Sequence, residues 1–158
     1  MRWLNKLLRP PAPSTADSPK EVEANVFKGR ARRVEIVGEG HYERALAKIA
    51  GPKTPNGVNM YVVARLVPEP TNRYDRNAVA AIIDGYIVGY LSRQQAINFH
   101  RAMNTRGFGG FSLTGCRAHI HWGWLRFEDG VRDEGNYSVT LLLPESIAQE
   151  IGFEVTDK

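Results

Sequence analysis

The sequence has a single cysteine, Cys116, so neither an intrachain disulfide nor a CxxC pair can form. This scarcity favours a reducing compartment, and we therefore expect a cytoplasmic protein. No apolar run approaches the roughly 18 residues of a membrane-spanning helix. The start, MRWLNKLLRPPAPS, is interrupted by Asn5 and Lys6 and followed by prolines, which does not fit a signal peptide. We expect no integral membrane segment.

The sequence also lacks the motifs with which many enzymes bind phosphate, metal or an acyl group. No GxxxxGK[ST] phosphate loop, GxSxG nucleophile motif or HExxH zinc motif occurs. The carboxylates of Glu69 and Asp84 are explained by a proline-flanked bend and a hairpin turn. We therefore expect a protein without enzyme activity and without a cofactor, and a metal-dependent nuclease or hydrolase is the least favoured alternative.

A zinc site is the one metal centre that the residue pattern raises. His119 and His121 stand two residues apart in a strand-like segment and share one face, but Cys116 falls on the opposite face. His41 and His100 belong to distant segments, whereas a structural zinc site needs four ligands. We favour surface histidines on a strand over a metal site.

Positive charge is concentrated at the start of the chain. The whole sequence carries 21 Lys and Arg against 17 Asp and Glu, a net charge of +4. Residues 1–33 hold eight of these basic and three of these acidic residues, so they carry +5 and the rest carries −1. A nucleic-acid site in the later part must therefore be small and local rather than a wide basic surface.

The sequence divides into a leader, one domain and a tail. Residues 1–33 are basic and contain proline, alanine and serine as linkers do, so we expect a flexible leader that can add non-specific DNA affinity. Residues 34–144 form the predicted domain, which is long enough to bury a hydrophobic core without disulfides. Residues 145–158 are assigned to a C-terminal tail.

The predicted domain contains several strands joined by turns. Residues 34–37 form a first strand, and residues 58–67 alternate as a second one. AVAAIIDGYIVGYL, residues 78–91, contains the Asp-Gly pair of a type I′ turn and predicts a hairpin. Later strands are predicted in CRAHIHWGW (116–124) and NYSVTLLL (136–143), with EDGVRDEG (128–135) as a loop between them.

Two short helices complete the predicted fold. Leu46 and Ile49 lie at helical spacing before Gly51, which ends the first helix. Ser92 and Gln95 form a capping box, which predicts a second helix from residue 93 to about residue 105. The buried stripe of this helix is Ala96, Phe99 and Met103. Hairpins, glycine bends and about six strands predict a mainly β fold, a small OB-like β-barrel with two short α-helices.

The connection LVPEPTNRYDRNAVAA, residues 66–81, has more polar and aromatic side chains than a turn needs. One Asx residue and a proline suffice to build a turn, whereas this segment carries Asn72, Tyr74, Asp75 and Asn77. Amide and carboxylate groups hydrogen-bond a nucleobase or a terminal hydroxyl, and a tyrosine offers a ring on which a base stacks. The alternative is that these side chains brace the turn, and the two roles are compatible.

A second candidate element precedes the first helix. The glycines of residues 38–40 let the chain turn sharply and present His41 and Tyr42, either as a stacking platform for a base or as ordinary packing at the helix start. A carboxylate is a poor partner for phosphate, so Asp75 in a DNA site would accept a hydrogen bond from a sugar hydroxyl. That chemistry favours a free strand end over continuous backbone.

GEGHYERAL, residues 38–46, and LVPEPTNRYDRNAVAAIIDGYIVGYLSRQQA, residues 66–96, resemble the HIRAN domain family. HIRAN domains occur in DNA-remodelling ATPases and as stand-alone bacterial proteins. The resemblance covers residues 34–144 and implies an OB-like β-barrel that holds the 3′ end of single-stranded DNA in a pocket. It also implies a part in DNA repair or replication. The hydrolase activity of large relatives belongs to their ATPase motor, whose motifs this sequence lacks.

The resemblance also implies which residues contact DNA. His41 and Tyr42 correspond to an aromatic pair, although eukaryotic members usually have a basic residue and two aromatics at positions 40–42. Asp75 would accept the hydrogen bond of the 3′-hydroxyl, and Tyr74 would contact a base. The complete predicted DNA-binding set is His41, Tyr42, Thr71, Asn72, Tyr74, Asp75, Asn77, Tyr90 and Tyr137. Tyr137 shares strand parity with Val139 and Leu141, so a place in the core is the alternative for that residue.

Together these observations predict a non-enzymatic module that binds single-stranded DNA at its 3′-hydroxyl end during DNA repair or replication. A repair or replication protein is the expected further partner. The main alternative is a protein-interaction adaptor that holds a partner through the same pocket or through the leader. In that case DNA binding would not depend on Tyr74 and Asp75.

Overall fold

The structure is a computed structural model, and it describes residues 20–152. Its main sheet consists of β1 (Glu21–Glu23), β2 (Ala31–Glu35), β3 (Val58–Pro68), β4 (Val79–Ile83), β5 (Tyr86–Tyr90), β6 (Ser112–Trp122) and β9 (Tyr137–Pro144). A separate hairpin consists of β7 (Leu125–Glu128) and β8 (Val131–Glu134). The helices are α1 (Glu43–Ala50), α2 (Arg93–Thr105) and α3 (Glu145–Ile151), with short 3₁₀ segments η1 (Ala24–Val26) and η2 (Glu39–Tyr42).

The main sheet closes on itself. Its strands follow the order β2-β9-β6-β3-β4-β5, and every neighbouring pair in this order is antiparallel. Val37, just after β2, exchanges two backbone hydrogen bonds with Tyr90 at the end of β5, with N–O distances of 2.8 and 2.9 Å. This bridge joins the two outer strands of the order. The predicted mainly β, OB-like barrel is therefore confirmed, with three α-helices in the described residues rather than two.

Helix α2 covers one end of the barrel core. Its predicted bounds and capping box are confirmed, since Ser92 Oγ accepts a hydrogen bond from the Gln95 N–H and Gln95 Oε1 accepts one from the Ser92 N–H. Phe99 has no exposed surface and is the largest fully buried side chain among residues 20–152. None of the helices in these residues has both the length and the hydropathy of a membrane span.

The fold includes more of the chain than residues 34–144. Strand β1 pairs in parallel with β6, and Val22, Ala24 and Phe27 are buried. Helix α3 packs against α2, and its buried residues are Ile147, Ala148 and Ile151. The prediction of a separate flexible leader is therefore wrong for residues 20–33, and the prediction of a tail is wrong for residues 145–151. Residues 1–19 and 153–158 lie outside the described part of the chain.

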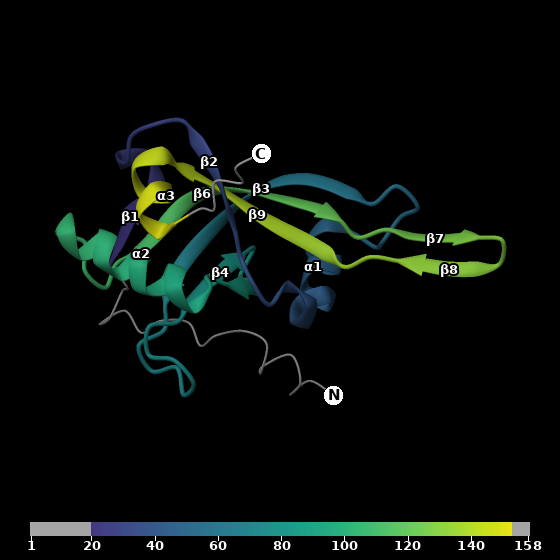
Figure 1. Ribbon diagram of the computed structural model, residues 1–158, viewed down its shortest axis with the longest axis horizontal. Coiled ribbons are helices and arrows are strands. Elements are labelled where there is room, and N and C mark those ends of the chain that lie inside the picture. The colour runs from purple at the N-terminus through teal and green to yellow at the C-terminus, as the bar shows by residue number, and fades with distance from the viewer. Residues whose placement is uncertain (1–19, 153–158) are drawn as a thin grey trace.

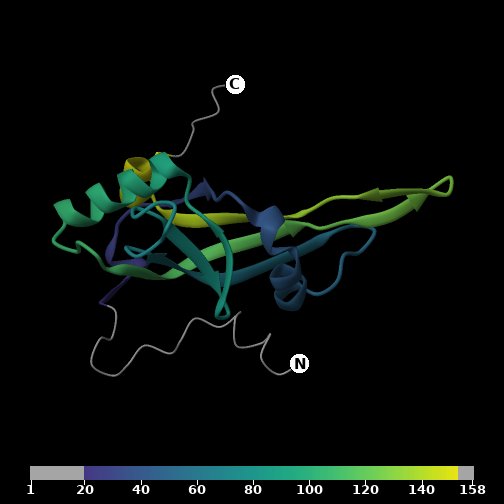
Figure 2. The same cartoon turned by 90° about the horizontal axis from the view of Figure 1, so that it is seen from below.

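The segment of residues 128–135, predicted as a loop, contains a tight turn and a strand. Asp129 and Gly130 have φ angles of 51° and 77°, which match those of Asp84 and Gly85 at the predicted β4–β5 hairpin, 52° and 80°. Both Asp-Gly pairs thus make the same left-handed turn between antiparallel strands. The β7–β8 hairpin extends away from the barrel at the end opposite α2 and α3 (Figures 1 and 2).

A methyl group at position 89 should loosen the barrel closure. In Gly89→Ala, the added Cβ would lie 2.8 Å from the Val37 carbonyl oxygen and 2.6 Å from Ile36 Cδ1. Because the Val37–Tyr90 bridge must then shift, we expect the free energy of unfolding to fall by about 1–3 kcal/mol. Chemical denaturation measures this loss. The control is Gly40→Ala, whose Cβ would meet only Asn136 Nδ2 at 3.5 Å; equal stability of the two variants would contradict the close contact.

Candidate nucleic-acid interface

Segment η2 places Tyr42 beside the end of β5. Gly38 precedes η2 with a φ of 83°, a left-handed conformation that lets the chain turn sharply after β2. The rings of Tyr42 and Tyr90 lie 6.4 Å apart, centroid to centroid, at an interplanar angle of 46°. His41 is exposed next to them. The structure thus places Tyr90 beside His41 and Tyr42, from which it is far apart in sequence.

Asn72 organises the turn between β3 and β4. Its Oδ1 accepts hydrogen bonds from the N–H groups of Tyr74 at 2.9 Å and Asp75 at 3.0 Å. Asp75 Oδ1 in turn accepts from the Asn77 N–H at 2.9 Å. These are Asx-type contacts that replace backbone hydrogen bonds in a long turn. The bracing role considered for Asn72 and Asp75 is confirmed.

Glu69 contacts the polar turn, and its charge acts on the tyrosine pair. Its Oε1 accepts a hydrogen bond from Asn72 Nδ2 at 3.0 Å. Burial raises the pKa of the Tyr90 hydroxyl, and the negative charge of Glu69 and the neighbouring Tyr42 hydroxyl raise it further. Tyr90 therefore stays protonated and can act as a donor. The proline-flanked bend alone does not indicate this role of Glu69; the available signal is its place three residues before Asn72 in the same turn.

Asp75 keeps one oxygen available at the surface. Its Oδ2 lies 3.9 Å from Arg93 Nε, and the Arg93 side chain is 79% exposed. An ion pair of this length and exposure contributes little to stability. Among the residues that the structure describes, no donor hydrogen-bonds Oδ2. Arg93, the first residue of α2, places a positive charge beside this oxygen and is not among the residues predicted from the sequence.

The remaining turn residues of the predicted set are exposed. Thr71 and Asn77 lie at the surface, and Tyr74 is 90% exposed, so its ring packs against almost nothing. His100 Nε2 lies 3.0 Å from the Asn77 carbonyl oxygen, which ties the turn to α2. A ring held out from a braced turn is free to contact a ligand.

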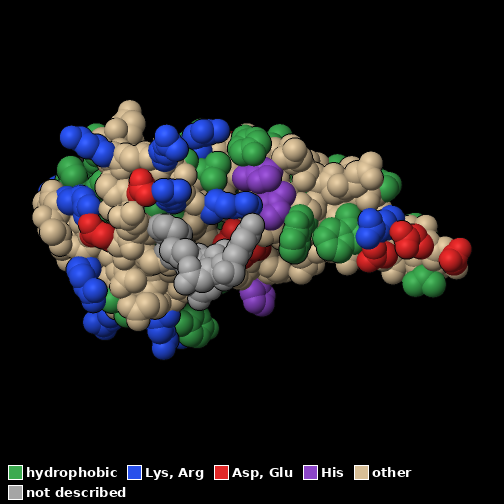
Figure 3. All heavy atoms as spheres, turned by 45° about the horizontal axis from the view of Figure 1, so that its top comes forward, with side chains coloured by type: hydrophobic (Ala, Val, Ile, Leu, Met, Phe, Trp, Pro, Cys, Tyr) green, Lys and Arg blue, Asp and Glu red, His purple; other side chains and the backbone are tan. Residues whose placement is uncertain are grey.

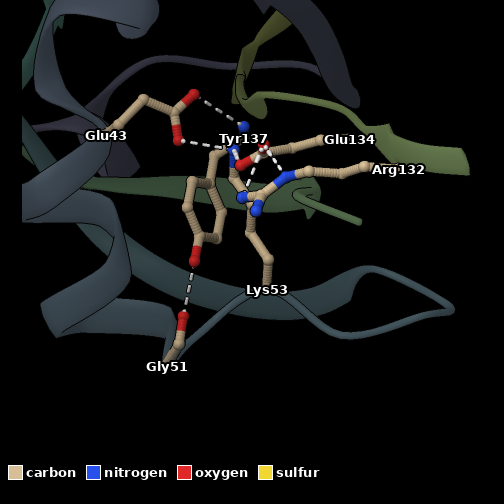
Figure 4. Close-up of polar contacts among 6 residues, drawn as sticks. All are labelled: Glu43, Gly51, Lys53, Arg132, Glu134 and Tyr137. Carbon is tan, nitrogen blue, oxygen red and sulfur yellow. Dashed lines mark hydrogen bonds and ion pairs between the residues drawn. The ribbon is translucent and has the colours of Figure 1, made fainter. Parts of the chain in front are cut away.

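Tyr137 belongs to the core, so its predicted place in the DNA site is wrong. Only 3% of its surface is exposed. Its hydroxyl donates to the Gly51 carbonyl at 2.7 Å, and its N–H donates to Glu43 Oε1 at 3.2 Å (Figure 4). The core alternative, indicated by the strand parity with Val139 and Leu141, is confirmed.

An ion network next to Tyr137 holds the start of α1 against the base of the β7–β8 hairpin. Lys53 Nζ lies 3.0 Å from Glu134 Oε1 and 3.5 Å from Glu43 Oε2 (Figure 4). The Lys53 side chain is only 14% exposed, and Arg132 also pairs with Glu134. Since α1 follows η2 directly, this network fixes the segment that presents His41 and Tyr42.

Two hollows border η2 and share Gly40. The first, of about 360 Å³, is lined by Tyr42, Lys48 and Tyr86 among others. The second, of about 370 Å³, is lined by residues that include Trp122 and Trp124. Volumes of this size fall in the range of small-ligand sites. His41 and Tyr42 themselves line the first hollow, and the second begins next to them at Gly40.

The two strand histidines have partners within the protein. His119 Nε2 lies 2.6 Å from Asn59 Oδ1, and His121 Nε2 lies 3.0 Å from Thr140 Oγ1. Cys116 is buried on the opposite face, where burial raises the pKa of its thiol to about 12. Within residues 20–152, no group of three or more His, Cys, Asp and Glu side chains is placed to hold a metal ion.

The chain is similar in structure to a known domain, although its sequence matches no family model. No protein-family model matches the chain, and no curated protein matches it. The structure is similar to the crystal structure of the HIRAN domain of human HLTF, with 16% sequence identity and a TM-score of 0.33. The match covers 81% of this chain and 93% of that chain. Residues 38–46 and 66–96 resemble the same domain family. No residue role and no function of the human domain is assigned to this chain from a TM-score of 0.33.

Proposed function

We propose that this protein is a non-enzymatic module that binds single-stranded DNA at its 3′-hydroxyl end. One observation supports the proposal most directly: Glu69, which accepts a hydrogen bond from Asn72 of the turn, also carries a charge that raises the pKa of Tyr90, whose ring lies beside that of Tyr42. Aromatic rings stack nucleobases with little sequence preference. Amide and carboxylate groups beside them hydrogen-bond base edges and sugar hydroxyls.

Each part of this site has a different proposed role. Asp75 Oδ2 accepts the hydrogen bond of the terminal 3′-hydroxyl, and Tyr42 or Tyr74 stacks on a terminal base. Glu69 and Asp75 together repel a terminal phosphate, whereas Arg93 beside them attracts the phosphate that links the last nucleotides. This arrangement would favour a hydroxyl end over a phosphorylated end.

We further propose that the protein acts by binding alone, in the cytoplasm, in DNA repair or replication. A 3′ end is a substrate of repair and replication proteins. The proposed consequence of binding is therefore the recruitment of such a protein to the end. The buried thiol of Cys116, which forms no disulfide, is compatible with a reducing compartment.

Removal of the Tyr42 ring tests this proposal. Stacking of a base on an aromatic ring contributes about 1–3 kcal/mol, so Tyr42→Ala should raise the Kd for a single-stranded oligonucleotide about 5- to 150-fold. Fluorescence anisotropy at fixed, moderate salt measures the Kd. The control is Phe127→Ala, which removes a 65% exposed ring from the distant β7 strand. Equal Kd values for wild type and Tyr42→Ala would count against the site.

A protein-interaction adaptor is the second candidate. The β7–β8 hairpin carries Phe127 and Val131, which are 65% and 67% exposed, on a projection that the barrel does not cover. Exposed apolar side chains of this kind are common where proteins bind one another. If Tyr42→Ala and Tyr74→Ala both leave DNA affinity unchanged, the adaptor becomes the better explanation.

A further inference from the structure

Five ring side chains form a continuous row on the outside of the barrel, away from the Tyr42–Tyr90 pair. The row, here called the ring row, consists of Tyr61, His119, His121, Trp122 and Trp124. Tyr61 stacks on His119 at 4.5 Å and His119 on His121 at 4.8 Å, both nearly parallel. Trp122 meets His121 at 5.6 Å and Trp124 at 5.9 Å, both edge to face.

Strand register places Tyr61, His119 and His121 of the ring row at the surface. Tyr61 of β3 lies directly opposite His119 of β6, while the alternate residue Ile120 points into the core. Tyr61 is 60% exposed and Trp122 is 59% exposed. Packing of the barrel therefore does not explain why such large rings stand at the two ends of the histidine pair.

The face around the ring row carries unpaired positive charge. In the strand register, Arg33, Leu142 and Arg117 follow one another across β2, β9 and β6. The Arg117 guanidinium lies 6.0 Å from the Tyr61 ring centroid. Among residues 20–152, neither arginine has a carboxylate within ion-pair distance. Arginines between exposed rings form a surface suited to an anionic chain with flat bases.

The negative charge of Glu35 offsets only part of that positive charge. Both carboxylate oxygens of Glu35 accept a hydrogen bond from Thr140 Oγ1, at 3.0 Å each. Burial lowers the pKa of His121, and the neighbouring His119 lowers it further. The lowered pKa of His121 disfavours its charged form, so the positive charge of the face comes from Arg33 and Arg117, and Glu35 offsets one of these two charges.

The ring row is connected to the proposed end site. The hollow of about 370 Å³ is lined by Trp122 and Trp124 on one side and by Glu39 and Gly40 of η2 on the other. Figure 3 shows histidine side chains bordered by hydrophobic ones, with Lys and Arg beside them, in a row that leads toward the β7–β8 end of the molecule. A strand whose end lies near Tyr42 can therefore continue through this hollow onto the ring row.

We propose that the ring row is a second binding surface, which holds internal nucleotides of a single-stranded nucleic acid by base stacking. Tyr61 and Trp122 provide the stacking faces, and Arg33 and Arg117 contact the phosphates. This proposal rests on the proposed function for one point only, the position of the 3′ end of the bound strand. Stacking of internal nucleotides on the ring row does not require the end to be read.

Strand length separates the two surfaces experimentally. We would measure Kd values for 5′-labelled oligothymidylates of about 3 and about 12 nucleotides, since OB folds cover about 4–16 nucleotides. Tyr61→Ala and Trp122→Ala should each weaken binding of the longer strand about 5- to 150-fold and leave the shorter strand unchanged. The matched control is Val63→Ala, which removes a 62% exposed side chain without a ring from the same face of β3.

Two further variants keep the test independent of folding. Tyr61→Phe retains the ring and should bind the longer strand as wild type does. Arg117→Gln should reduce the slope of log K against log salt by about 0.7 if it removes one phosphate contact. Thermal unfolding of every variant identifies any that lose the barrel, and conclusions are drawn only from the folded ones.

The outcomes distinguish this proposal from the proposed function. If Tyr61→Ala and Trp122→Ala bind the longer strand as tightly as Val63→Ala does, the ring row does not bind nucleic acid and a protein partner is the better occupant. If those variants still prefer 3′-hydroxyl ends, the proposed site at Tyr42, Tyr90 and the turn of residues 69–77 is still supported. If wild type shows no such preference but both variants weaken binding of the longer strand, nucleic-acid binding by the ring row is supported and recognition of the 3′ end is contradicted.

Discussion

The Asp75→Asn variant is expected to lose most of the preference for a 3′-hydroxyl end while remaining folded. A hydrogen bond to a charged group contributes about 1.5–3 kcal/mol. The ratio of the Kd for a phosphate-ended strand to the Kd for a hydroxyl-ended strand should therefore fall about 10- to 150-fold, and at most to 1. Asparagine keeps the Oδ1 that braces the Asn77 N–H, and it replaces Oδ2 with an NH₂ group that cannot accept. The measurement is the anisotropy of hydroxyl-ended and phosphate-ended strands.

Asp75→Ala is the informative companion of this variant. It removes both Oδ2 and the brace to Asn77, so we expect the same loss of preference together with about 0.5–1.5 kcal/mol of lost stability. If Asp75→Asn keeps the wild-type preference, Asp75 only braces the turn. Asp75→Asn removes only the acceptor Oδ2, whereas Asp75→Ala removes both oxygens. Comparison of the two variants therefore shows whether the carboxylate binds a ligand or only braces the turn.

Replacement of Phe99 by alanine is expected to destabilise the barrel by about 3–5 kcal/mol, because a fully buried ring leaves a cavity that the core fills only partly. For a chain of this size the melting temperature should fall by about 6–20 °C. The neighbouring His100 holds the Asn77 carbonyl, so loosening α2 should also weaken DNA binding. Calorimetry and anisotropy measure the two effects.

The control for this variant is Phe127→Ala, the same substitution at a 65% exposed position on the β7–β8 hairpin. A surface change of this kind should alter stability by less than about 0.5 kcal/mol. Equal stability losses in the two variants would show that α2 is not packed into the core as described.

Features that depend on residues close in sequence could be predicted. The capping box of Ser92 and Gln95 and the Asp84–Gly85 turn each specify a local backbone conformation, and both occur as predicted. The bracing by Asn72 was also predictable, because its partners lie two and three residues away. In each case the physical cause is contained in a few neighbouring residues.

Features that depend on distant residues could not be predicted in the same way. Strand β1 exists because Glu21–Glu23 pairs with β6, and the pair Glu21 and Ser112 is separated by most of the chain. The effect of the Glu69 charge on the pKa of Tyr90 likewise requires the folded barrel. The β7–β8 hairpin was missed for another reason: its strands are only four residues long, and β8 carries a single apolar residue. The signals that were present are the alternation of Leu125 and Phe127 with charged residues and the Asp129–Gly130 turn, which resembles that of the earlier hairpin.

We propose that the turn of residues 69–77 and the Tyr42–Tyr90 pair bind a free 3′-hydroxyl end. The most direct test compares wild-type binding of one single-stranded oligonucleotide that ends in a 3′-hydroxyl with binding of the same strand ending in a 3′-phosphate. Anisotropy at fixed, moderate salt should give a Kd for the hydroxyl-ended strand at least about tenfold lower, as expected from one charged hydrogen bond. Equal Kd values for the two ends would contradict the claim.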